Sequence, residues 1–235
     1  MKQLVISFLL FPLLIWSQTN FEKAEKFFKE EKFNQAKPIF ESILKNNPSD
    51  FKTIEYLGDI AGLEKSWDKA IFYYKKLKQL KPTEADYFYK YGGAMGMKAK
   101  EVNKFRALGM IDEVRESFEK AIVLNSGHVD ARWALIELNL QLPAIVGGSE
   151  SEAIKYSNEL LKLSPVDGYL SRGRIEEHFK RYKASELQYK KAISIAGSKM
   201  CYQVLANLYK NKMNEPEKAK NVLEELRKKE LSENL

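Results

Sequence analysis

The chain has 235 residues, of which 44% are hydrophobic and 30% are charged. This composition supports a folded core and excludes a largely disordered chain, because disordered chains carry too few apolar residues to bury. The formal net charge is +7, but lysines alternate with glutamates along most of the chain, which favours solvated helix faces over a polyanion-binding stripe.

Residues 1–18 have the pattern of a secretory signal peptide. Lys2 precedes a short apolar run from Leu4 to Trp16, and the small residue Ser17 follows that run. A membrane-spanning helix needs about 20 apolar residues, which is more than this run provides. We therefore expect an exported protein of the periplasm or the extracellular space, with no stable membrane span once the signal is removed.

From residue 19 onwards, the sequence predicts helical hairpins arranged as repeats. Apolar residues recur three and four positions apart, as in amphipathic helices. Ala24 corresponds to Gly58, and Phe40 to Tyr74, at a constant spacing of 34 residues, and a fixed period of this size is typical of repeat arrays. The predicted units lie near residues 19–50, 51–84, 85–128, 129–165, 166–199 and 200–230.

The third and fourth units contain insertions between their two helices. The segment KAKEVNKFRAL is expected to add a helical turn or two, with Val102, Phe105 and Leu108 on one side. The segment LPAIVGGS has an apolar tip at Ile145 and Val146. That tip either packs over the first insertion, which we favour, or is exposed for binding. Because insertions in repeat proteins often serve binding, these loops are one candidate interaction surface.

Four positions recur with a consistent residue type: two hold small residues, one holds an aromatic residue and one holds proline. The residues that fit are Ala24, Gly58, Gly92, Gly173, Ala206, Ala36, Ala70, Ala153, Ser185, Ala219, Phe40, Tyr74, Phe118, Tyr189, Pro48, Pro82 and Pro165. The residues that depart are Val114, Ser126, Ile136, Ser157 and Leu223. This pattern resembles the tetratricopeptide repeat. The resemblance implies an all-α, right-handed solenoid of about six helix-turn-helix repeats over residues 19–235.

In such repeats, a single hairpin cannot bury its apolar face alone. We expect the small residues to let the two helices of a hairpin approach closely, and the aromatic residue to fill the gap to the next hairpin. The resemblance also implies that the first helix of each hairpin lines a concave groove. The groove positions in this chain are Phe21, Glu25, Phe28, Lys52, Glu55, Asp59, Tyr89, Gly93, Gly96, Met97, Trp133, Glu137, Leu140, Gln141, Leu170, Arg174, Glu177 and His178.

Two glycines stand out among these positions, since glycine inside a helix costs about 0.5–1 kcal/mol relative to alanine. Gly93 and Gly96 either open a hollow that Tyr89, Met97 and Trp133 wall, or only admit the insertion that follows them. Both readings remain open at this stage. The strongest partner-binding candidates are Tyr89, Gly93, Gly96, Met97, Trp133, Glu137, Leu140, Arg174 and His178.

Motifs of the common catalytic and cofactor sites are missing from the sequence. His128 and His178 are far apart, and neither belongs to a zinc-binding pattern. The glycine-containing segments lack the Lys-Ser or Lys-Thr ending of a phosphate-binding loop, and no nucleophile elbow is present. We therefore expect no catalytic residue, no cofactor and no dedicated metal site.

These observations predict a non-catalytic protein–protein interaction scaffold of the periplasm or cell envelope, such as an assembly factor or a subunit of an envelope complex. A protein or peptide would bind through the concave groove or the inserted loops, and no nucleic acid is expected. The first alternative is a polyanion-binding module, and the second is an enzyme or an enzyme subunit.

Overall fold

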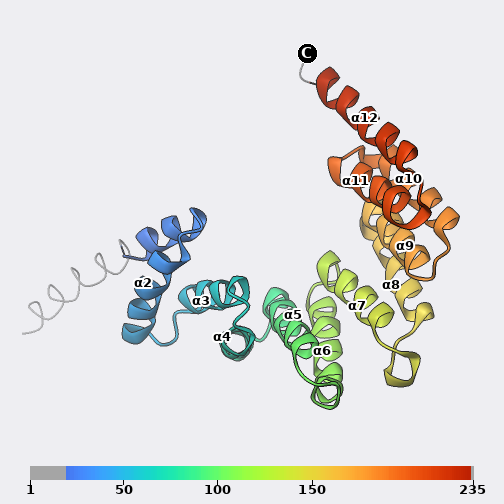
Figure 1. Cartoon of the computed structure of the whole chain (residues 1–235). Coiled ribbons are helices and arrows are strands. Elements are labelled where there is room, and N and C mark those ends of the chain that lie inside the picture. Colours follow the sequence, from blue (N-terminus) through green and yellow to red (C-terminus); the bar gives the residue numbers. More distant parts are fainter. Residues whose placement is uncertain (1–19, 234–235) are drawn as a thin grey trace, which may run out of the picture. The chain divides into compact units, whose positions relative to one another are not determined.

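The computed structural model describes residues 20–233, and the predicted signal peptide lies outside the described residues. Within that range the regular secondary structure is entirely helical, as the ribbon in Figure 1 shows. Consecutive helices pack against each other as hairpins. The prediction of an all-α fold built from repeated hairpins is therefore confirmed.

The described residues form two compact units, which divide between Leu124 and Asn125. In the first unit, each helix packs against the next one along the chain. Its elements are a helix over residues 20–29, α2 (Phe33–Asn46), α3 (Phe51–Leu63), α4 (Trp67–Leu80), α5 (Ala85–Glu101) and α6 (Lys104–Leu124).

The second unit also consists of helices that pack against their neighbours in the chain, and α7 additionally contacts α9. Its elements are α7 (Val129–Gln141), the 3₁₀ turn η1 (Ala144–Val146), α8 (Glu150–Leu163), α9 (Pro165–His178), α10 (Tyr182–Ala196), α11 (Lys199–Leu208), the π-helical turn η2 (Tyr209–Met213) and α12 (Pro216–Glu233).

The recurring small and aromatic residues pack against each other inside single hairpins. A Cβ atom added at Gly58 would lie 2.6 Å from the ring of Tyr74, and one added at Gly173 would lie 2.3 Å from the ring of Tyr189. Because real Cβ atoms do not approach other atoms so closely, only glycine lets these rings lie against the first helix. The aromatic position also reaches the next hairpin, as expected, since the ring of Phe40 stacks on that of Tyr56 at 4.8 Å.

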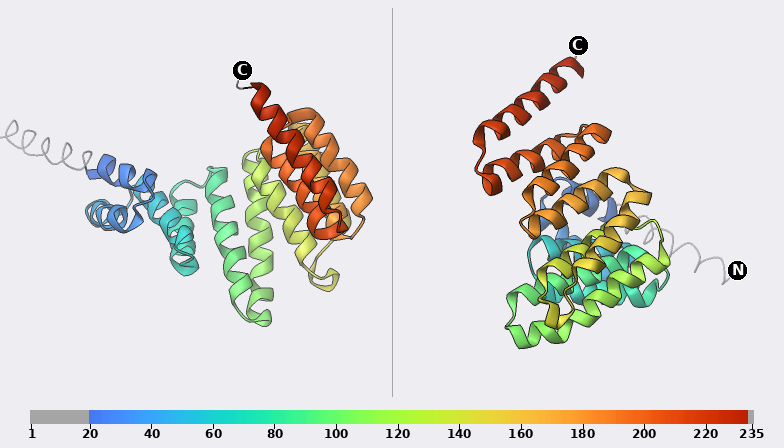
Figure 2. Two further views of the ribbon diagram at one scale, coloured as in Figure 1. Left: turned by 45° about the horizontal axis from the view of Figure 1, so that its top comes forward. Right: turned by 90° about the vertical axis from the view of Figure 1, so that its right-hand side faces the viewer.

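The insertion in the third hairpin lengthens both of its helices, which confirms the expected extra turns. α5 and α6 have 17 and 21 residues, whereas α3 and α4 have 13 and 14. At about 1.5 Å per residue, the end of this hairpin extends roughly 6–10 Å farther than an uninserted one would. In Figure 2 the turn between α5 and α6 extends past the neighbouring α3–α4 hairpin of the same unit.

The insertion in the fourth hairpin forms η1, and its apolar tip is not packed as we had favoured. The side chain of Ile145 is 92% exposed, while that of Val146 is only partly exposed. The backbone at Gly148 passes close to that of Leu142. A Cβ atom at Gly148 would lie 1.8 Å from the carbonyl oxygen of Leu142, so only glycine fits at this point of the turn. None of the helices among residues 20–233 combines the length and apolarity needed to cross a bilayer.

Candidate functional site

The first unit has a hollow of about 300 Å³ on the first helices of its first two hairpins. We call it the first hollow. Asp50 begins α3 by accepting hydrogen bonds from the backbone N–H groups of Lys52 and Thr53. From that start, residues three and four positions apart share one helix face. The residues that line the hollow are Phe21, Glu25, Lys52, Glu55, Tyr56 and Asp59.

Aromatic rings form one wall of the first hollow. Tyr56 packs edge-on against Phe21 at 5.8 Å, and its hydroxyl donates a 2.7 Å hydrogen bond to Glu25. Burial and then the Glu25 carboxylate raise the pKa of Tyr56 to about 12. The same hydrogen bond, together with Lys29 at 3.2 Å, lowers the pKa of Glu25. Glu25 is therefore a charged carboxylate that already has two partners.

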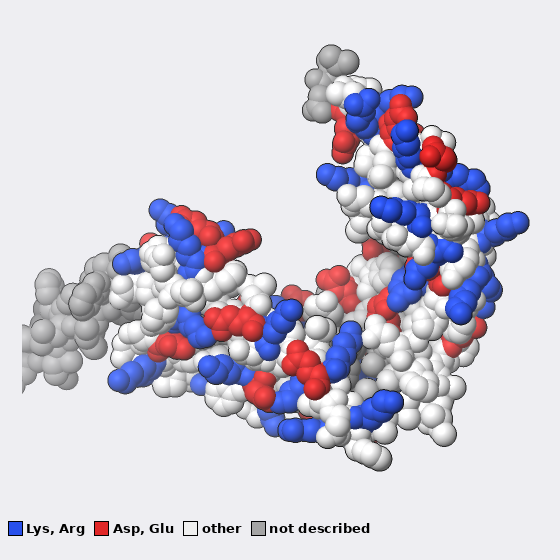
Figure 3. Space-filling view, viewed as in Figure 1, with Lys and Arg blue, Asp and Glu red and all other residues white. Residues whose placement is uncertain are grey.

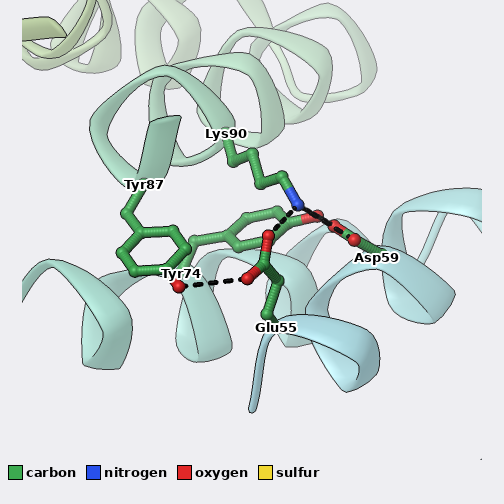
Figure 4. Close-up of polar contacts among 5 residues, drawn as sticks. All are labelled: Glu55, Asp59, Tyr74, Tyr87 and Lys90. Atoms are coloured by element: carbon green, nitrogen blue, oxygen red, sulfur yellow. Dashed lines mark hydrogen bonds and ion pairs between the residues drawn. The ribbon is translucent and has the colours of Figure 1, made fainter. Parts of the chain in front are cut away.

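The other two carboxylates of the first hollow are joined by a lysine from the next hairpin. In Figure 4, Lys90 extends from α5 towards Glu55 and Asp59 of α3, with N–O distances of 2.7 and 2.8 Å. Tyr87 donates a 3.0 Å hydrogen bond to Glu55, and Tyr74 donates a 2.7 Å hydrogen bond to Asp59.

This network changes the proton affinity of its lysine and of its two tyrosines. Burial opposes the charge of Lys90, but the carboxylates of Asp59 and Glu55 outweigh burial and raise its pKa. Burial, followed by the neighbouring carboxylate, raises the pKa of Tyr74 and Tyr87 well above the ordinary range. At neutral pH the lysine of the network is thus a cation, and its two phenols are neutral. It joins the second hairpin to the third.

The second unit has a hollow of about 290 Å³ on the first helices of its own hairpins. We call it the second hollow. Leu170 and Tyr189 are only 5% and 3% exposed and form a packed floor, while Trp133 is half-buried and Met200 is 54% exposed. The lining residues are Trp133, Asp167, Leu170, Arg174, Tyr189, Met200 and Val204.

The charged groups of the second hollow are held by partners within the second unit. Arg174 donates two hydrogen bonds to the carboxylate of Glu137, at 2.8 and 3.1 Å. The indole N–H of Trp133 donates to Asp167 at 2.8 Å. Ser164, the N-cap of α9, also donates to Asp167, at 2.5 Å. These contacts fix Trp133 and Arg174 in place, so the remaining free surface of the hollow is mainly apolar.

The predicted groove positions are partly brought together by the fold. Five of them from the first two hairpins line the first hollow, and Trp133, Leu170 and Arg174 line the second. Leu140 is 4% exposed and does not belong to the residues that line either hollow. His178 packs edge-on against Phe179 at 4.9 Å.

The predicted residues on α5 lie in the first unit. A Cβ atom at Gly93 would meet nothing within 4 Å, and one at Gly96 would meet only Val114, at 3.7 Å. Neither glycine is therefore needed to admit the lengthened α6. Met97 is 40% exposed, and Tyr89 packs against Phe118 with ring centroids 5.9 Å apart. Because Trp133 belongs to the second unit, the hollow predicted around Gly93 and Gly96 stays a prediction.

Several residues of the hollows were missed by the sequence analysis. Asp167 and Met200 occupy the second position of their hairpins, so the positional rule that selected Lys52 would have found them at that position of the last two units. Tyr56 and Lys90 occupy the sixth position, which the resemblance does not assign to the groove. Only the pairing of consecutive hairpins in the structure reveals them.

The first unit also has a hollow on the second helices of its hairpins. A third hollow, of about 240 Å³, lies among α2, α3 and α4 and is lined in part by Phe72, which is 64% exposed. Its residues come mainly from the second helices of hairpins. Among residues 20–233, no group of three or more His, Cys, Asp or Glu side chains is arranged to hold a metal ion.

No protein-family model matches the chain, and no curated protein matches it either. Solved structures do match. PilW, described as a widely conserved type IV pilus biogenesis factor, superposes with a TM-score of 0.66 at 16% identity, covering 90% of this chain and 92% of PilW.

Two other solved structures give the same picture. TTC0263, a thermophilic tetratricopeptide-repeat protein of Thermus thermophilus, has a TM-score of 0.64 at 16% identity, covering 82% of this chain and 98% of that protein. YrrB, described as a tetratricopeptide-repeat protein with an unusual peptide-binding site, has a TM-score of 0.54 at 15% identity, covering 77% of this chain and 87% of YrrB. These likenesses establish the tetratricopeptide-repeat fold, which is typical of protein–protein interaction.

Proposed function

We propose that this chain is a non-catalytic scaffold of the periplasm or cell envelope that binds a protein partner through the first helices of its hairpins. The observation that carries the proposal is that the predicted groove positions line a hollow in each unit. The second hollow is the primary contact. Its polar side chains already have partners within the second unit. The indole ring of Trp133, the thioether of Met200 and the aliphatic side chain of Val204 remain available to a side chain of the partner.

The size and chemistry of the second hollow define its occupant. Small-molecule pockets usually enclose about 300–1,000 Å³, so a hollow of about 290 Å³ suits one or two side chains of a peptide. Buried aromatic residues at the centre of an interface commonly carry most of its binding energy. We expect an apolar or aromatic side chain of the partner to pack against Trp133, with the partner backbone near Arg174.

The charge pattern favours a protein partner over a polyanion. In Figure 3, Lys and Arg side chains are interspersed with Asp and Glu side chains over the visible faces of both units. A polyanion-binding stripe would need a continuous field of one sign. Binding of the partner should therefore depend only weakly on salt concentration.

The envelope location draws support from the pattern of residues 1–18 and from the fold likeness to PilW. Mass spectrometry of the protein recovered from an envelope fraction tests this location. Removal of the first 18 residues is expected. A mass that still includes residues 1–18 would contradict export by a cleaved signal peptide.

Peptide selection tests the binding proposal. A random peptide library displayed on phage is selected against the purified protein, and the affinities of the selected peptides are measured by calorimetry. We expect the selected peptides to share an apolar or aromatic residue, and Trp133→Ala to weaken their binding at least about tenfold, as for a typical hot spot. The control is Phe72→Ala, which alters the hollow among α2, α3 and α4.

Three results would count against the proposal. If Trp133→Ala left the affinity unchanged, the second hollow would not be the contact. If Phe72→Ala weakened binding instead, the partner would bind to the second helices of the hairpins. If the affinity fell steeply as salt rose, with a slope that reports several released counterions, the polyanion alternative would replace the proposal.

A further inference from the structure

The end of the α5–α6 hairpin carries an exposed apolar group that the fold does not use. The side chain of Phe105 is 90% exposed, and that of Leu108, three residues farther along α6, is 45% exposed. Residues three apart lie on the same face of a helix. Large exposed apolar residues at a projecting end are a marker of an interaction site when charged residues surround them.

Cations surround this apolar group. Lys104 and Arg106 flank Phe105 on α6, and Lys100 lies in the last turn of α5; all three are exposed, and their side chains form no ion pair within the described residues. We call this set the α5–α6 tip. Figure 3 shows Lys and Arg side chains on both sides of this end of the hairpin. The tip consists of Lys100, Val102, Lys104, Phe105, Arg106 and Leu108.

The acidic residue closest to these cations is Glu101, the last residue of α5 and the neighbour of Lys100 in the chain. Glu101 accepts a 2.6 Å hydrogen bond from the indole of Trp67 in α4, and Asp68 of α4 forms an ion pair with Lys98. These contacts anchor the hairpin to its neighbour. Among the described residues, Glu101 forms no ion pair with Lys100, Lys104 or Arg106, and these three cations outnumber it.

We propose that the α5–α6 tip docks this protein onto an anionic phospholipid surface. Phe105 and Leu108 enter the boundary between headgroups and acyl chains, while the three cations contact lipid phosphates. A combination of apolar anchoring and surrounding lysine or arginine is what the interface of an anionic membrane binds. A free polyphosphate would use the cations but would leave Phe105 without a role.

The tip at Ile145 provides an internal comparison. Its side chain is 92% exposed, as much as that of Phe105, but the surrounding segment LPAIVGGS contains no lysine or arginine. An apolar residue alone gives weak membrane affinity, so Ile145 should contribute little. The membrane contact is also separate from the peptide contact at Trp133, and the two proposals can fail independently.

Vesicle sedimentation tests the proposal. The purified protein is mixed with vesicles of phosphatidylcholine alone, or of phosphatidylcholine and phosphatidylglycerol in equal amounts, at low salt. We expect binding to the anionic vesicles only. Phe105→Ala should weaken it about tenfold through loss of apolar burial. Lys104→Gln and Arg106→Gln should each weaken it about fivefold, because each cation near an anionic surface raises the affinity by about that factor.

Matched controls lie on the same helix, far from the tip. Val123, which is 75% exposed, and Lys120 lie near the other end of α6. Val123→Ala and Lys120→Gln should leave vesicle binding unchanged, as should Ile145→Ala and Trp133→Ala. All the substituted residues at the tip are exposed, so the variants should fold normally.

Four outcomes would overturn the proposal. Equal binding to the neutral vesicles would remove the role of anionic lipid. An unchanged affinity of Phe105→Ala would remove the apolar anchor. Equal losses in the Val123 or Lys120 controls would show nonspecific adhesion. Binding to soluble polyphosphate as tight as to vesicles, with no effect of Phe105→Ala, would assign the cations to a polyanion.

Discussion

Glu25, Glu55 and Asp59 line the hollow of the first unit, whereas Trp133, Leu170 and Met200 line that of the second. Both hollows lie on the first helices of consecutive hairpins and have nearly the same volume. In the first unit, polar side chains join one hairpin to the next. In the second unit, polar side chains also join one hairpin to the next, since Arg174 of α9 pairs with Glu137 of α7, but apolar surface is left open beside them. The repeat therefore fixes where a hollow forms, while the residues at a few positions decide whether charged or apolar side chains line it.

The largest expected effects come from the aromatic residues that cover a glycine in each unit. Tyr189→Ala and Tyr74→Ala should each lower the free energy of unfolding by about 3–5 kcal/mol, because both rings are almost fully buried. Urea denaturation followed by circular dichroism measures this. Only Tyr189 lines a hollow, so Tyr189→Ala alone should also weaken binding of the selected peptides.

Leu187→Ala is the matched control for this pair, because Leu187 lies on the same helix as Tyr189 and is 53% exposed. Its effect on stability should stay within about 0.5 kcal/mol. If Tyr74→Ala weakened peptide binding as much as Tyr189→Ala did, the proposed division between the two hollows would be wrong.

The ion pairs of the two hollows should differ in their contribution to stability. Lys90→Met leaves two partly buried carboxylates without their cation and should cost about 2 kcal/mol. Arg174→Met removes one partly exposed pair and should cost about 1 kcal/mol or less. Lys52→Met, at an exposed lysine of the first hollow, serves as the control, with an effect within about 0.5 kcal/mol. Equal stability of the Lys90 and Lys52 variants would show that the network of Figure 4 does not hold the hairpins together.

The smallest predicted effect is a loss of stability at high pH. Burial, followed by a nearby carboxylate, raises the pKa of Tyr74 in the first unit and of Tyr189 in the second. Above about pH 10 the unfolded chain loses these phenol protons while the folded chain keeps them. The unfolded state then binds fewer protons, so stability is complete below that pH and falls as the pH rises.

Phenylalanine variants isolate this contribution. Tyr74→Phe should cost about 1 kcal/mol at neutral pH through the lost hydrogen bond to Asp59. It should also make the decline in stability between about pH 9 and about pH 11 shallower. Tyr189→Phe makes the same test for the second unit. A slope identical to that of the unaltered protein would contradict the assignment of the pH effect to these phenols.

Much of the fold could be predicted from the sequence because the repeat period and the glycine–aromatic pairs are local features. The small residue at Gly58 and the ring of Tyr74 follow from one pattern, and the structure confirms their contact. The pairing of Lys90 with Glu55 could not be predicted, because it depends on how one hairpin is rotated against the next. The exposure of Ile145 was also missed, since sequence alone does not show whether a neighbouring segment covers a turn.

The state of the Trp133 indole on peptide binding tests the central claim most directly. The ¹H–¹⁵N resonance of this indole is followed while a selected apolar peptide is added, with Trp67 of the first unit as the internal reference. The account predicts that the Trp133 resonance shifts and saturates with the binding curve while that of Trp67 stays in place. A saturating curve with an unmoved Trp133 resonance would contradict it.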